Sequence, residues 1–356
     1  MISSILMGSA GEIVLAVFLL VVGIVLIVKG GDYFVDAASW IAEISGLSPL
    51  LIGATVVSVA TTLPELIVSI IATARGTMEI AVGNAVGSVV ANLGLIMAIS
   101  LFFMPGKVDR KQYLFKSVIL LVAAFNLFMV GLFGEMKDGH HVMSVVTGVL
   151  VIEIFILFLG ENILSAVKAM KNPVINGLDP DSKGTNVPIE SEEAEHSEPA
   201  KKDKKTIIIN ILKFIGGAGG IIGGAELLVS NGQKLAIAAG VPEGIIAVTL
   251  VAIGTSLPEL VTTITAIVKK KSSISVGNII GANVIDMTLI LPICSMVSGG
   301  TLIFPQQAIY LDLPFCLGLS AIAVVPMLVT KKFRRWQGIA LFALYAAYLT
   351  LRILYT

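Results

Sequence analysis

Charged residues are scarce in this chain of 356 residues, at 13% of the sequence against about 25% in soluble domains. Hydrophobic residues make up 56%, and the mean hydropathy is +0.96. Runs of 18 or more mostly apolar residues recur along the whole length. This pattern excludes an ordinary soluble domain and predicts an all-α polytopic membrane protein whose main partner is the lipid bilayer.

Several other residue types and motifs are also scarce or missing. Only two cysteines occur, Cys294 and Cys316, both in apolar runs, so a disulfide framework and a CxxC metal site are excluded. The adjacent His140 and His141 lie in a polar connection, which we interpret as a solvated loop. The net charge is zero, which gives no basic footprint for nucleic acid. No nucleophile–base pair or nucleotide-binding loop occurs, so we expect neither an enzyme nor a resident cofactor.

Ten transmembrane helices fit the apolar runs. We expect them near residues 12–29, 49–74, 79–103, 114–133, 142–166, 207–230, 242–268, 274–298, 308–330 and 336–355. The first twelve residues contain no Lys or Arg, so they lack the basic start of a signal peptide and are expected to form a short tail. The polar segment 168–205 contains too little apolar surface to fold alone and is predicted to be a mobile linker.

The distribution of Lys and Arg predicts the orientation in the membrane. With the N-terminus outside, only four of the 24 basic residues fall on the outer side, namely Arg75, Lys137, Lys234 and Arg352. Basic residues concentrate on the cytoplasmic side of membrane proteins. We therefore expect a multi-pass protein of the cell membrane with both termini outside and the linker 168–205 in the cytoplasm.

An internal repeat relates the two halves by an offset of 194 residues. "LPEL" at 63–66 matches "LPEL" at 257–260, "VGN" at 82–84 matches "VGN" at 276–278, and Asn92 matches Asp286. Each copy has five predicted spans, and an odd number inverts the second copy in the membrane. The sequence predicts two inverted five-helix repeats, 1–167 with its core at about 49–103 and 206–356 with its core at about 242–298. This plan is common in secondary transporters, which bind their substrate where the repeats meet.

Each repeat places a proline and a glutamate side by side inside an apolar span, Pro64–Glu65 and Pro258–Glu259. Proline removes a helical hydrogen bond and leaves the carbonyl four residues earlier without its partner. A buried acid at a helix centre costs roughly 2.5–3.5 kcal/mol on insertion scales. Freed carbonyls beside a carboxylate suit a dehydrated cation, which favours a binding site over a mere kink.

Helical spacing adds further oxygen ligands to both glutamates. Thr61 lies one turn before Glu65, with Ser58 and Thr62 beside it, and the second copy supplies Ala252, Thr255 and Ser256 near Glu259. On the following helices Asn84, Ser88 and Asn92 share one face, and Asn278, Ala282 and Asp286 share the equivalent face. An all-oxygen set suits Ca²⁺ and Na⁺, and soft ligands for zinc or copper are missing. We expect ligation at Asn92 and Asp286; Asn84 and Asn278 fit ligation and interhelical contact equally well.

At these residues the sequence resembles the cation/Ca²⁺ exchanger superfamily, and within it the microbial sodium/calcium exchangers. The segments "GATVVSVATTLPEL" with "AVGNAVGSVVANLGLI" and "AVTLVAIGTSLPEL" with "SVGNIIGANVIDMTLI" are similar to the two α-repeats of that family. The resemblance implies an antiporter that exchanges Na⁺ for Ca²⁺ by alternating access and extrudes Ca²⁺. The alternatives are K⁺-dependent exchange, exchange of H⁺ or another divalent cation on the same fold, and, from another class, a cation channel.

The resemblance also implies ligand roles. Ca²⁺ would bind Glu65 and Glu259, helped by carbonyls at Thr61 and Thr255. Sodium would use these four residues together with Ser58, Thr62, Ser88, Ala252 and Ser256, and Asn92 and Asp286 would complete the centre. The sequence departs from the family at Ala282, where a serine is usual, and at Thr62. The missing glutamate in "GNAVGS" and "GNIIGA" argues against proton coupling.

Overall fold

The structure is a computed structural model, and it describes residues 10–171, 203–239 and 254–355. The first half contains α1 (Ala10–Ser45), α2 (Pro49–Ile52), η1 (Gly53–Val57), α3 (Ser58–Ala74), α4 (Met78–Ala91), η2 (Asn92–Met97), α5 (Ala98–Phe103), β1 (Gly106–Lys107), α6 (Arg110–Phe133), β2 (Glu135–Lys137), β3 (His140–Met143) and α7 (Val145–Lys171). The η segments are π-helical turns.

The second half contains α8 (Lys204–Ala238), α11 (Leu257–Val268), α12 (Ser272–Ile285), η4 (Asp286–Ile290), α13 (Leu291–Val297), β4 (Leu302–Ile303), η5 (Ala308–Asp312), α14 (Leu313–Thr330), β5 (Lys332–Phe333) and α15 (Arg335–Tyr355). Helices α7 and α8 extend into both ends of the predicted linker, and the residues between them lie outside the described part of the chain.

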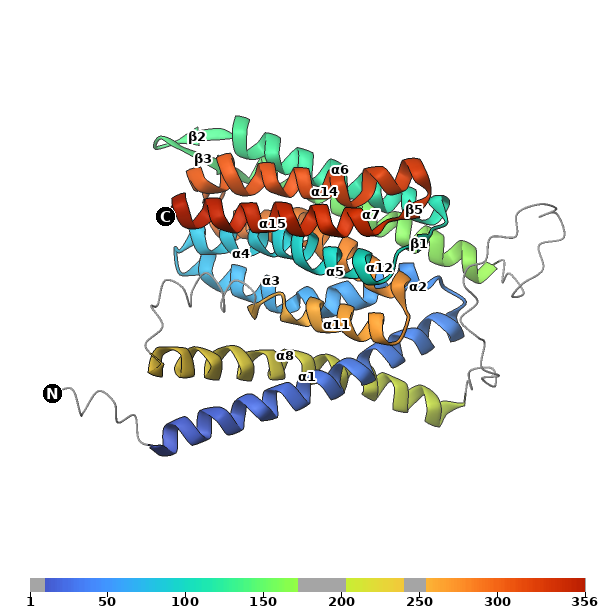
Figure 1. The fold of residues 1–356 in the computed structure, drawn as a ribbon. Coiled ribbons are helices and arrows are strands. Elements are labelled where there is room, and N and C mark those ends of the chain that lie inside the picture. The colour runs from blue at the N-terminus through green and yellow to red at the C-terminus, as the bar shows by residue number, and fades with distance from the viewer. Residues whose placement is uncertain (1–9, 172–202, 240–253, 356) are drawn as a thin grey trace.

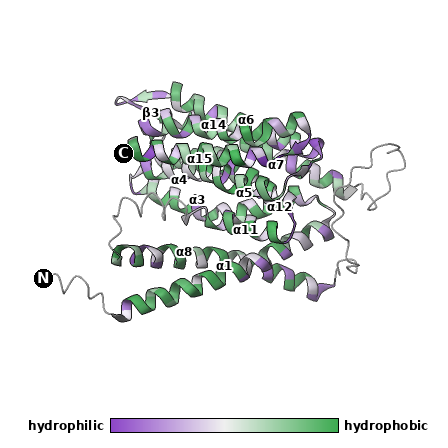
Figure 2. Ribbon diagram, in the orientation of Figure 1, coloured by the Kyte–Doolittle hydropathy of each residue, from purple (hydrophilic) through white to green (hydrophobic). Residues whose placement is uncertain are grey.

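Nine helical segments within the described residues are long and apolar enough to cross a membrane. Hydrophobic residues run along the helices, whereas hydrophilic residues gather at the β2–β3 hairpin and at helix ends (Figure 2). The predicted seventh span, 242–268, is described only from residue 254 onward, where it contains α11. The prediction of an all-α polytopic membrane protein is confirmed.

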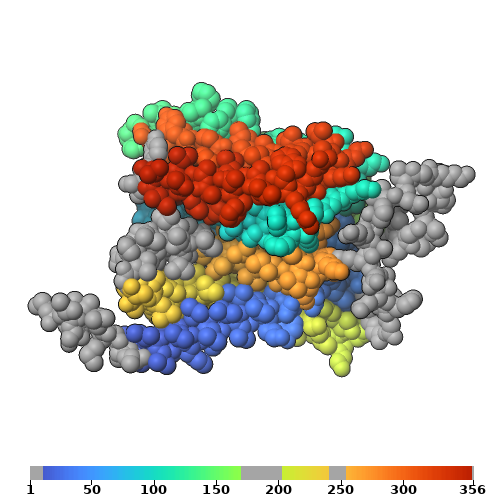
Figure 3. Space-filling model, viewed as in Figure 1, coloured from blue at the N-terminus to red at the C-terminus, as the bar shows by residue number. Residues whose placement is uncertain are grey.

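The first span differs from its predicted bounds of 12–29. Helix α1 continues to Ser45, so its 36 residues extend about 54 Å, well beyond the roughly 30 Å of a bilayer core. The apolar run ends at Lys29 because Asp32 and Asp36 follow, yet the backbone stays helical. Helices α1 and α8 cross each other along one edge of the molecule (Figures 1 and 3).

Glycines let α1 and α8 approach closely where they cross. A Cβ atom on Gly23 would lie 2.9 Å from the Gly224 carbonyl oxygen, and one on Gly30 would lie 2.8 Å from the Gly217 carbonyl oxygen. The offset of 194 residues relates Gly23 to Gly217 and Gly30 to Gly224. The crossing therefore brings equivalent positions of the two repeats together, as inverted repeats require.

The α2–η1 segment of the first repeat packs against α12 of the second. A Cβ atom on Gly277 would lie 2.5 Å from the Leu50 carbonyl oxygen, and one on Gly281 would lie 2.5 Å from both the Ala54 carbonyl oxygen and the Ser58 Oγ. Small residues at membrane helix contacts allow this backbone approach. The largest core cluster surrounds α4 and α12, which places the most buried part of the protein between the repeats.

Two small antiparallel sheets join the connections. β1 pairs with β5, and β3 lies between β2 and β4. The predicted start of the fifth span at residue 142 is wrong, because Val142 and Met143 pair with Ile303 and Leu302 and the helix begins at Val145. Ladder pairing outside the helix satisfies the backbone of this apolar segment.

Candidate functional site

Three acidic side chains lie in the buried centre of the protein. Glu65 comes from α3, Glu259 from the first turn of α11 and Asp286 from the start of η4, and each is at most 1% exposed. The Glu65 carboxylate lies within electrostatic range of both Glu259 and Asp286. The two repeats thus bring their acids together, as their positions in the sequence predict.

Polar contacts join the repeats around these acids. The Thr62 hydroxyl donates to Glu259 Oε1 at 3.3 Å, and the Thr61 hydroxyl lies 3.1 Å from Asn278 Oδ1, to which it donates. Both bonds connect α3 of the first repeat to helices of the second. The site is therefore built at the repeat interface rather than inside one repeat.

The charged oxygens of the site have few partners from the protein. Both oxygens of Glu65 and of Asp286, and Oε2 of Glu259, are buried without a hydrogen bond to any described residue. A buried carboxylate without a partner is costly, because the lost hydration is not replaced. The same holds for the Asn92 Oδ1, Ser88 Oγ and Ser256 Oγ atoms. Buried anionic and neutral oxygens of this kind are the ligands that a dehydrated hard cation takes.

Several hydroxyls keep lone pairs available for a cation. Ser58 donates to the Thr55 carbonyl at 3.1 Å, and Thr62 has the Ser58 carbonyl 2.7 Å away as a second acceptor. A hydroxyl that donates its proton to the backbone still presents its oxygen as an acceptor. Ser58 and Thr62 are buried in α3 beside Glu65, which suits them to ligation.

The helices are distorted at positions that the repeat relates. Asn92 is the first residue of η2, and Asp286 is the first residue of η4. π-helical turns of this kind are frequent at functional sites because they redirect side chains and loosen backbone bonding. Both central polar residues therefore project from equivalent distortions.

The two prolines act differently. In the second repeat Pro258 lies in the first turn of α11, after a turn at Thr255 and Ser256, so the helix breaks there as the sequence indicates. In the first repeat α3 continues through Pro64, and the distortion is the π-helical turn η1 that precedes it. A turn immediately before the proline is therefore present only in the second copy.

Not every predicted ligand is placed by the structure. Ala252 lies outside the described residues, and Thr255 is half-buried in the turn before α11. Ala282 is buried and offers only a methyl group where Ser88 offers a hydroxyl in the other repeat. Within the described residues, no three His, Cys, Asp or Glu side chains converge tightly enough to hold a metal ion by themselves. A cation here therefore needs hydroxyl, amide or carbonyl oxygens in addition to carboxylates.

Asparagines beside the site have separate roles. Asn84 donates to the Glu65 carbonyl oxygen at 3.2 Å and to Ser69 Oγ at 3.0 Å, so it acts as an interhelical contact between α3 and α4. Asn283 is fully buried with both amide atoms unpartnered among the described residues. Sequence reasoning missed Asn283 because the repeat aligns it with Val89, and its spacing of three residues from Asp286 was the only available signal.

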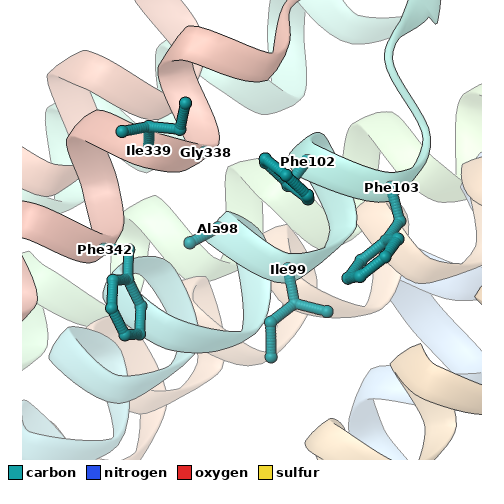
Figure 4. Close-up of a pocket in the computed structure, with 7 residues that line it drawn as sticks. All are labelled: Ala98, Ile99, Phe102, Phe103, Gly338, Ile339 and Phe342. Carbon is teal, nitrogen blue, oxygen red and sulfur yellow. The ribbon is translucent and has the colours of Figure 1, made fainter.

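Within the described residues, the histidine and cysteine side chains and the pocket between α5 and α15 are not part of the buried acidic site. His140 is exposed in β3, and Cys294 and Cys316 are free and buried. A pocket of about 220 Å³ lies between α5 and α15 and is lined only by apolar residues such as Phe102, Ile339 and Phe342 (Figure 4). Without oxygen ligands, this pocket cannot bind a bare cation.

Comparisons with known proteins agree with this geometry. Residues 15–163 and 209–354 match the family model described as "Sodium/calcium exchanger protein". The sodium/calcium exchanger MaX1 of Methanosarcina acetivorans is 31% identical over 350 residues, which cover 93% of this chain and 96% of that protein. The inner membrane protein YrbG of Escherichia coli is 31% identical over 290 residues, or 80% of this chain and 81% of that protein.

Solved structures give the same result. A structure of the sodium–calcium exchanger NCX_Mj, soaked with 2.5 mM Na⁺ and 10 mM Sr²⁺, superposes with a TM-score of 0.74 at 26% sequence identity. The match covers 95% of this chain and 99% of that chain. The similarity therefore extends over both repeats and includes the elements that carry the buried acids.

Proposed function

Because the chain belongs to the sodium/calcium exchanger family and is a membrane transporter, we propose that it couples Na⁺ entry to Ca²⁺ extrusion by alternating access. The observation that carries this proposal is the placement of Glu65 and Glu259. They come from inverted repeats, both are buried, and three of their four carboxylate oxygens have no hydrogen-bond partner among the described residues. A single site shared by two inverted halves suits exposure first to one side of the membrane and then to the other.

The proposed calcium site consists of the Glu65 and Glu259 carboxylates with backbone carbonyls at Thr61 and Thr255. The proposed sodium sites share these four residues and add Ser58 and Thr62 on one side and Ser88, Ala252 and Ser256 on the other. Asn92 and Asp286 complete the centre. The burial of Ser58, Thr61, Thr62, Ser88 and Ser256 supports this assignment.

Charge balance constrains the ions that can be carried together. Glu65, Glu259 and Asp286 sum to −3 when all are ionised, which three Na⁺ neutralise. One Ca²⁺ leaves one negative charge buried, and an unpaired buried charge is too costly to retain. We therefore propose that either a proton on Asp286 or a K⁺ ion accompanies Ca²⁺.

The proposed location is the cell membrane, with both termini outside and the linker 168–205 in the cytoplasm. The strong bias of Lys and Arg toward the linker side supports this orientation. Ca²⁺ then leaves the cell through the face that carries the β2–β3 hairpin.

Tracer exchange in liposomes tests this function. At fixed pH, an outward Na⁺ gradient should drive saturable uptake of ⁴⁵Ca into liposomes that contain the protein, and Glu65→Gln or Glu259→Gln should abolish it. Glu153→Gln is the matched control, because Glu153 is an exposed acid within α7.

The outcomes separate the alternatives. Uptake that follows a pH gradient and ignores Na⁺ would indicate H⁺/Ca²⁺ exchange, and non-saturating flux without countertransport would indicate a channel. Full Na⁺-driven uptake in either glutamine variant would contradict the assigned site.

A further inference from the structure

An ion-pair cluster joins α1 to the end of α11, away from the buried acids. Lys269 is the residue at the C-terminal cap of α11, and its Nζ atom lies 2.7 Å from Asp36 Oδ1 and 3.3 Å from Asp32 Oδ1. The same Nζ donates to the Asp32 carbonyl oxygen at 3.2 Å. The side chain of Lys269 is 23% exposed, whereas the neighbouring Lys270 and Lys271 are exposed.

The inverted repeat supplies an equivalent set of residues on the opposite side. The offset of 194 residues relates Lys269 to Arg75, Asp32 to Glu226 and Asp36 to Ser230. Arg75 caps the C-terminus of α3 as Lys269 caps α11, and Glu226 lies on α8 as Asp32 lies on α1. Both repeats therefore carry a basic residue at this helix cap and an acid at the equivalent position of the long crossing helix.

Only the set around Lys269 forms ion pairs within the described residues. Glu226 accepts a hydrogen bond from the Ser230 hydroxyl of its own helix at 2.8 Å. Arg75 is exposed, and no ion pair joins it to another part of the described chain. The interaction that Lys269 makes with α1 thus has no counterpart between Arg75 and α8.

Helix packing has the same asymmetry. α1 packs along α11 more extensively than α8 packs along α3. At Gly31 a Cβ atom would lie 2.7 Å from Thr265 Oγ1 and 3.1 Å from Val261 Cγ1, so α1 lies directly on α11 there. The ion-pair cluster fastens the more tightly packed of two equivalent helix contacts.

A preference for basic residues at helix C-termini explains part of this pattern. A cation at that end interacts favourably with the helix dipole. This effect explains why Lys269 and Arg75 are both basic. It does not explain why Asp32 and Asp36 contact Lys269, or why α8 has an acid at the position equivalent to Asp32. A second role is needed for the acids.

We propose that Lys269, Asp32 and Asp36 form an ionic latch that holds α1 against α11 while one face of the transporter is closed. Arg75 and Glu226 form the equivalent latch on the other face when the transporter turns over. The proposal rests on the alternating access proposed above and adds that the contact between α1 and α11 opens when the binding site changes face. The two latches then close in turn, because the inverted halves exchange conformations.

Thiol cross-linking tests the latch directly. One variant combines Asp36→Cys with Lys269→Cys, and the other combines Glu226→Cys with Arg75→Cys; the native Cys294 and Cys316 are buried. With a short bifunctional thiol reagent, the two pairs should give opposite yields: in the ion condition where the first pair cross-links readily, the second should cross-link poorly. The cross-linking yields are then measured again in saturating Na⁺ and in saturating Ca²⁺. If an added ion raises the yield of one pair, it should lower the yield of the other.

A charge variant measures the contribution of the ion pairs. Lys269→Gln, placed in the Glu226→Cys/Arg75→Cys background, should raise cross-linking of that pair about two- to fivefold, the range expected for a partly exposed ion pair. Lys270→Gln is the matched control and should leave the yield unchanged.

The proposal is overturned if the Arg75–Glu226 pair never cross-links under any ion condition, or if both pairs rise and fall together. An equal effect of Lys269→Gln and Lys270→Gln would also overturn it, because general charge would then explain the result. Cross-linking does not require transport. A wild-type protein that fails to exchange Na⁺ for Ca²⁺ would therefore refute the proposed function while the latch is still judged by its own yields.

Discussion

The residues of the proposed site divide into carboxylates, which would supply charge, and neutral oxygens, which would supply coordination geometry. Glu65, Glu259 and Asp286 are the charged members, and their burial follows from their positions inside apolar spans. The neutral members differ between the repeats, most clearly at Ser88 and Ala282. This difference makes the two halves chemically unequal although their backbones are related.

The Ser88/Ala282 position predicts how sodium affinity can be tuned. Ala282→Ser adds a hydroxyl at the position equivalent to Ser88 and should lower the half-saturating Na⁺ concentration about two- to tenfold, the effect of one added polar interaction. The Na⁺ dependence of ⁴⁵Ca exchange measures this change. Ser88→Ala is the reciprocal control and should raise the same value; identical Na⁺ dependence in all three proteins would contradict a ligand role at this position.

The charge on Asp286 predicts a dependence on an accompanying cation. Asp286→Asn reduces the buried charge to −2, which one Ca²⁺ neutralises. Calcium exchange by the wild type should therefore depend on K⁺ or on proton concentration, and the variant should lose that dependence. Exchange assays with and without K⁺ over a range of pH provide the measurement. If neither K⁺ nor pH affects the wild type, or if both effects survive in the variant, the charge argument is wrong.

At the residue scale, the sequence could predict that these polar side chains are buried inside apolar spans but not how they contact one another. The repeat singled out Glu65, Glu259, Asn92 and Asp286, because polar residues at matching places in apolar spans are costly. The contacts of Thr62 with Glu259 and of Thr61 with Asn278 depend on how the repeats dock. Their separation along the chain leaves no local signal.

The elements show which parts of the fold tolerate change. Helices α1 and α8 cross where glycines face each other, whereas other glycines of α8 have no atom near their Cβ position. Gly217 and Gly219 are two residues apart on α8. Gly217 lies at the crossing, whereas a Cβ atom on Gly219 would have no other atom within 4 Å. A Gly→Ala substitution changes helix propensity by a similar amount at both positions, so the difference between the two variants tests the crossing itself.

Gly217→Ala should destabilise the protein, because the new methyl group would lie 2.7 Å from the Phe34 nitrogen and 2.8 Å from the Gly30 carbonyl oxygen. Overpacking of this kind costs about 1–3 kcal/mol. Gly219→Ala is the control and should be neutral or stabilising by up to about 1 kcal/mol, because alanine favours the helix. Thermal unfolding in detergent measures both; equal melting temperatures would show that the crossing is not tightly packed.

At the element scale, apolar runs predicted the helices but not their ends. The apolar run ends at Lys29, whereas helix α1 continues to Ser45. The charged residues Asp32 and Asp36 lower the hydropathy after Lys29 but do not end the helix. The strands were too short to produce a period-2 pattern, so Val142 and Met143 of β3 were assigned to a helix and His140 and His141 to a loop. π-helical turns such as η2 and η4 leave no pattern in the composition and could only be found in the structure.

The whole molecule is organised by its inverted repeat, which was predictable because an ungapped offset of 194 residues matches Gly, Pro, Asn and Glu rather than apolar residues alone. The orientation in the membrane is a separate proposal, which rests on where the basic residues lie in the sequence. It follows from the charges of the connections.

The orientation predicts which connections are accessible from each side. A cysteine at Lys137, exposed in β2, should react with an impermeant maleimide applied to intact cells, whereas one at Lys332, exposed in β5, should react only after the membrane is permeabilised. Cys294 and Cys316 are buried and serve as the unreactive background. Labelling in the reverse order would place the linker outside and contradict the proposed orientation.

The most direct test of the account is diffraction from crystals soaked with Sr²⁺, an anomalous scatterer that substitutes for Ca²⁺. The account predicts one strong anomalous peak at the repeat interface, in contact with carboxylate oxygens of both Glu65 and Glu259, and its loss in Glu65→Gln crystals. A peak elsewhere, or carboxylates turned apart with no ion between them, would contradict it.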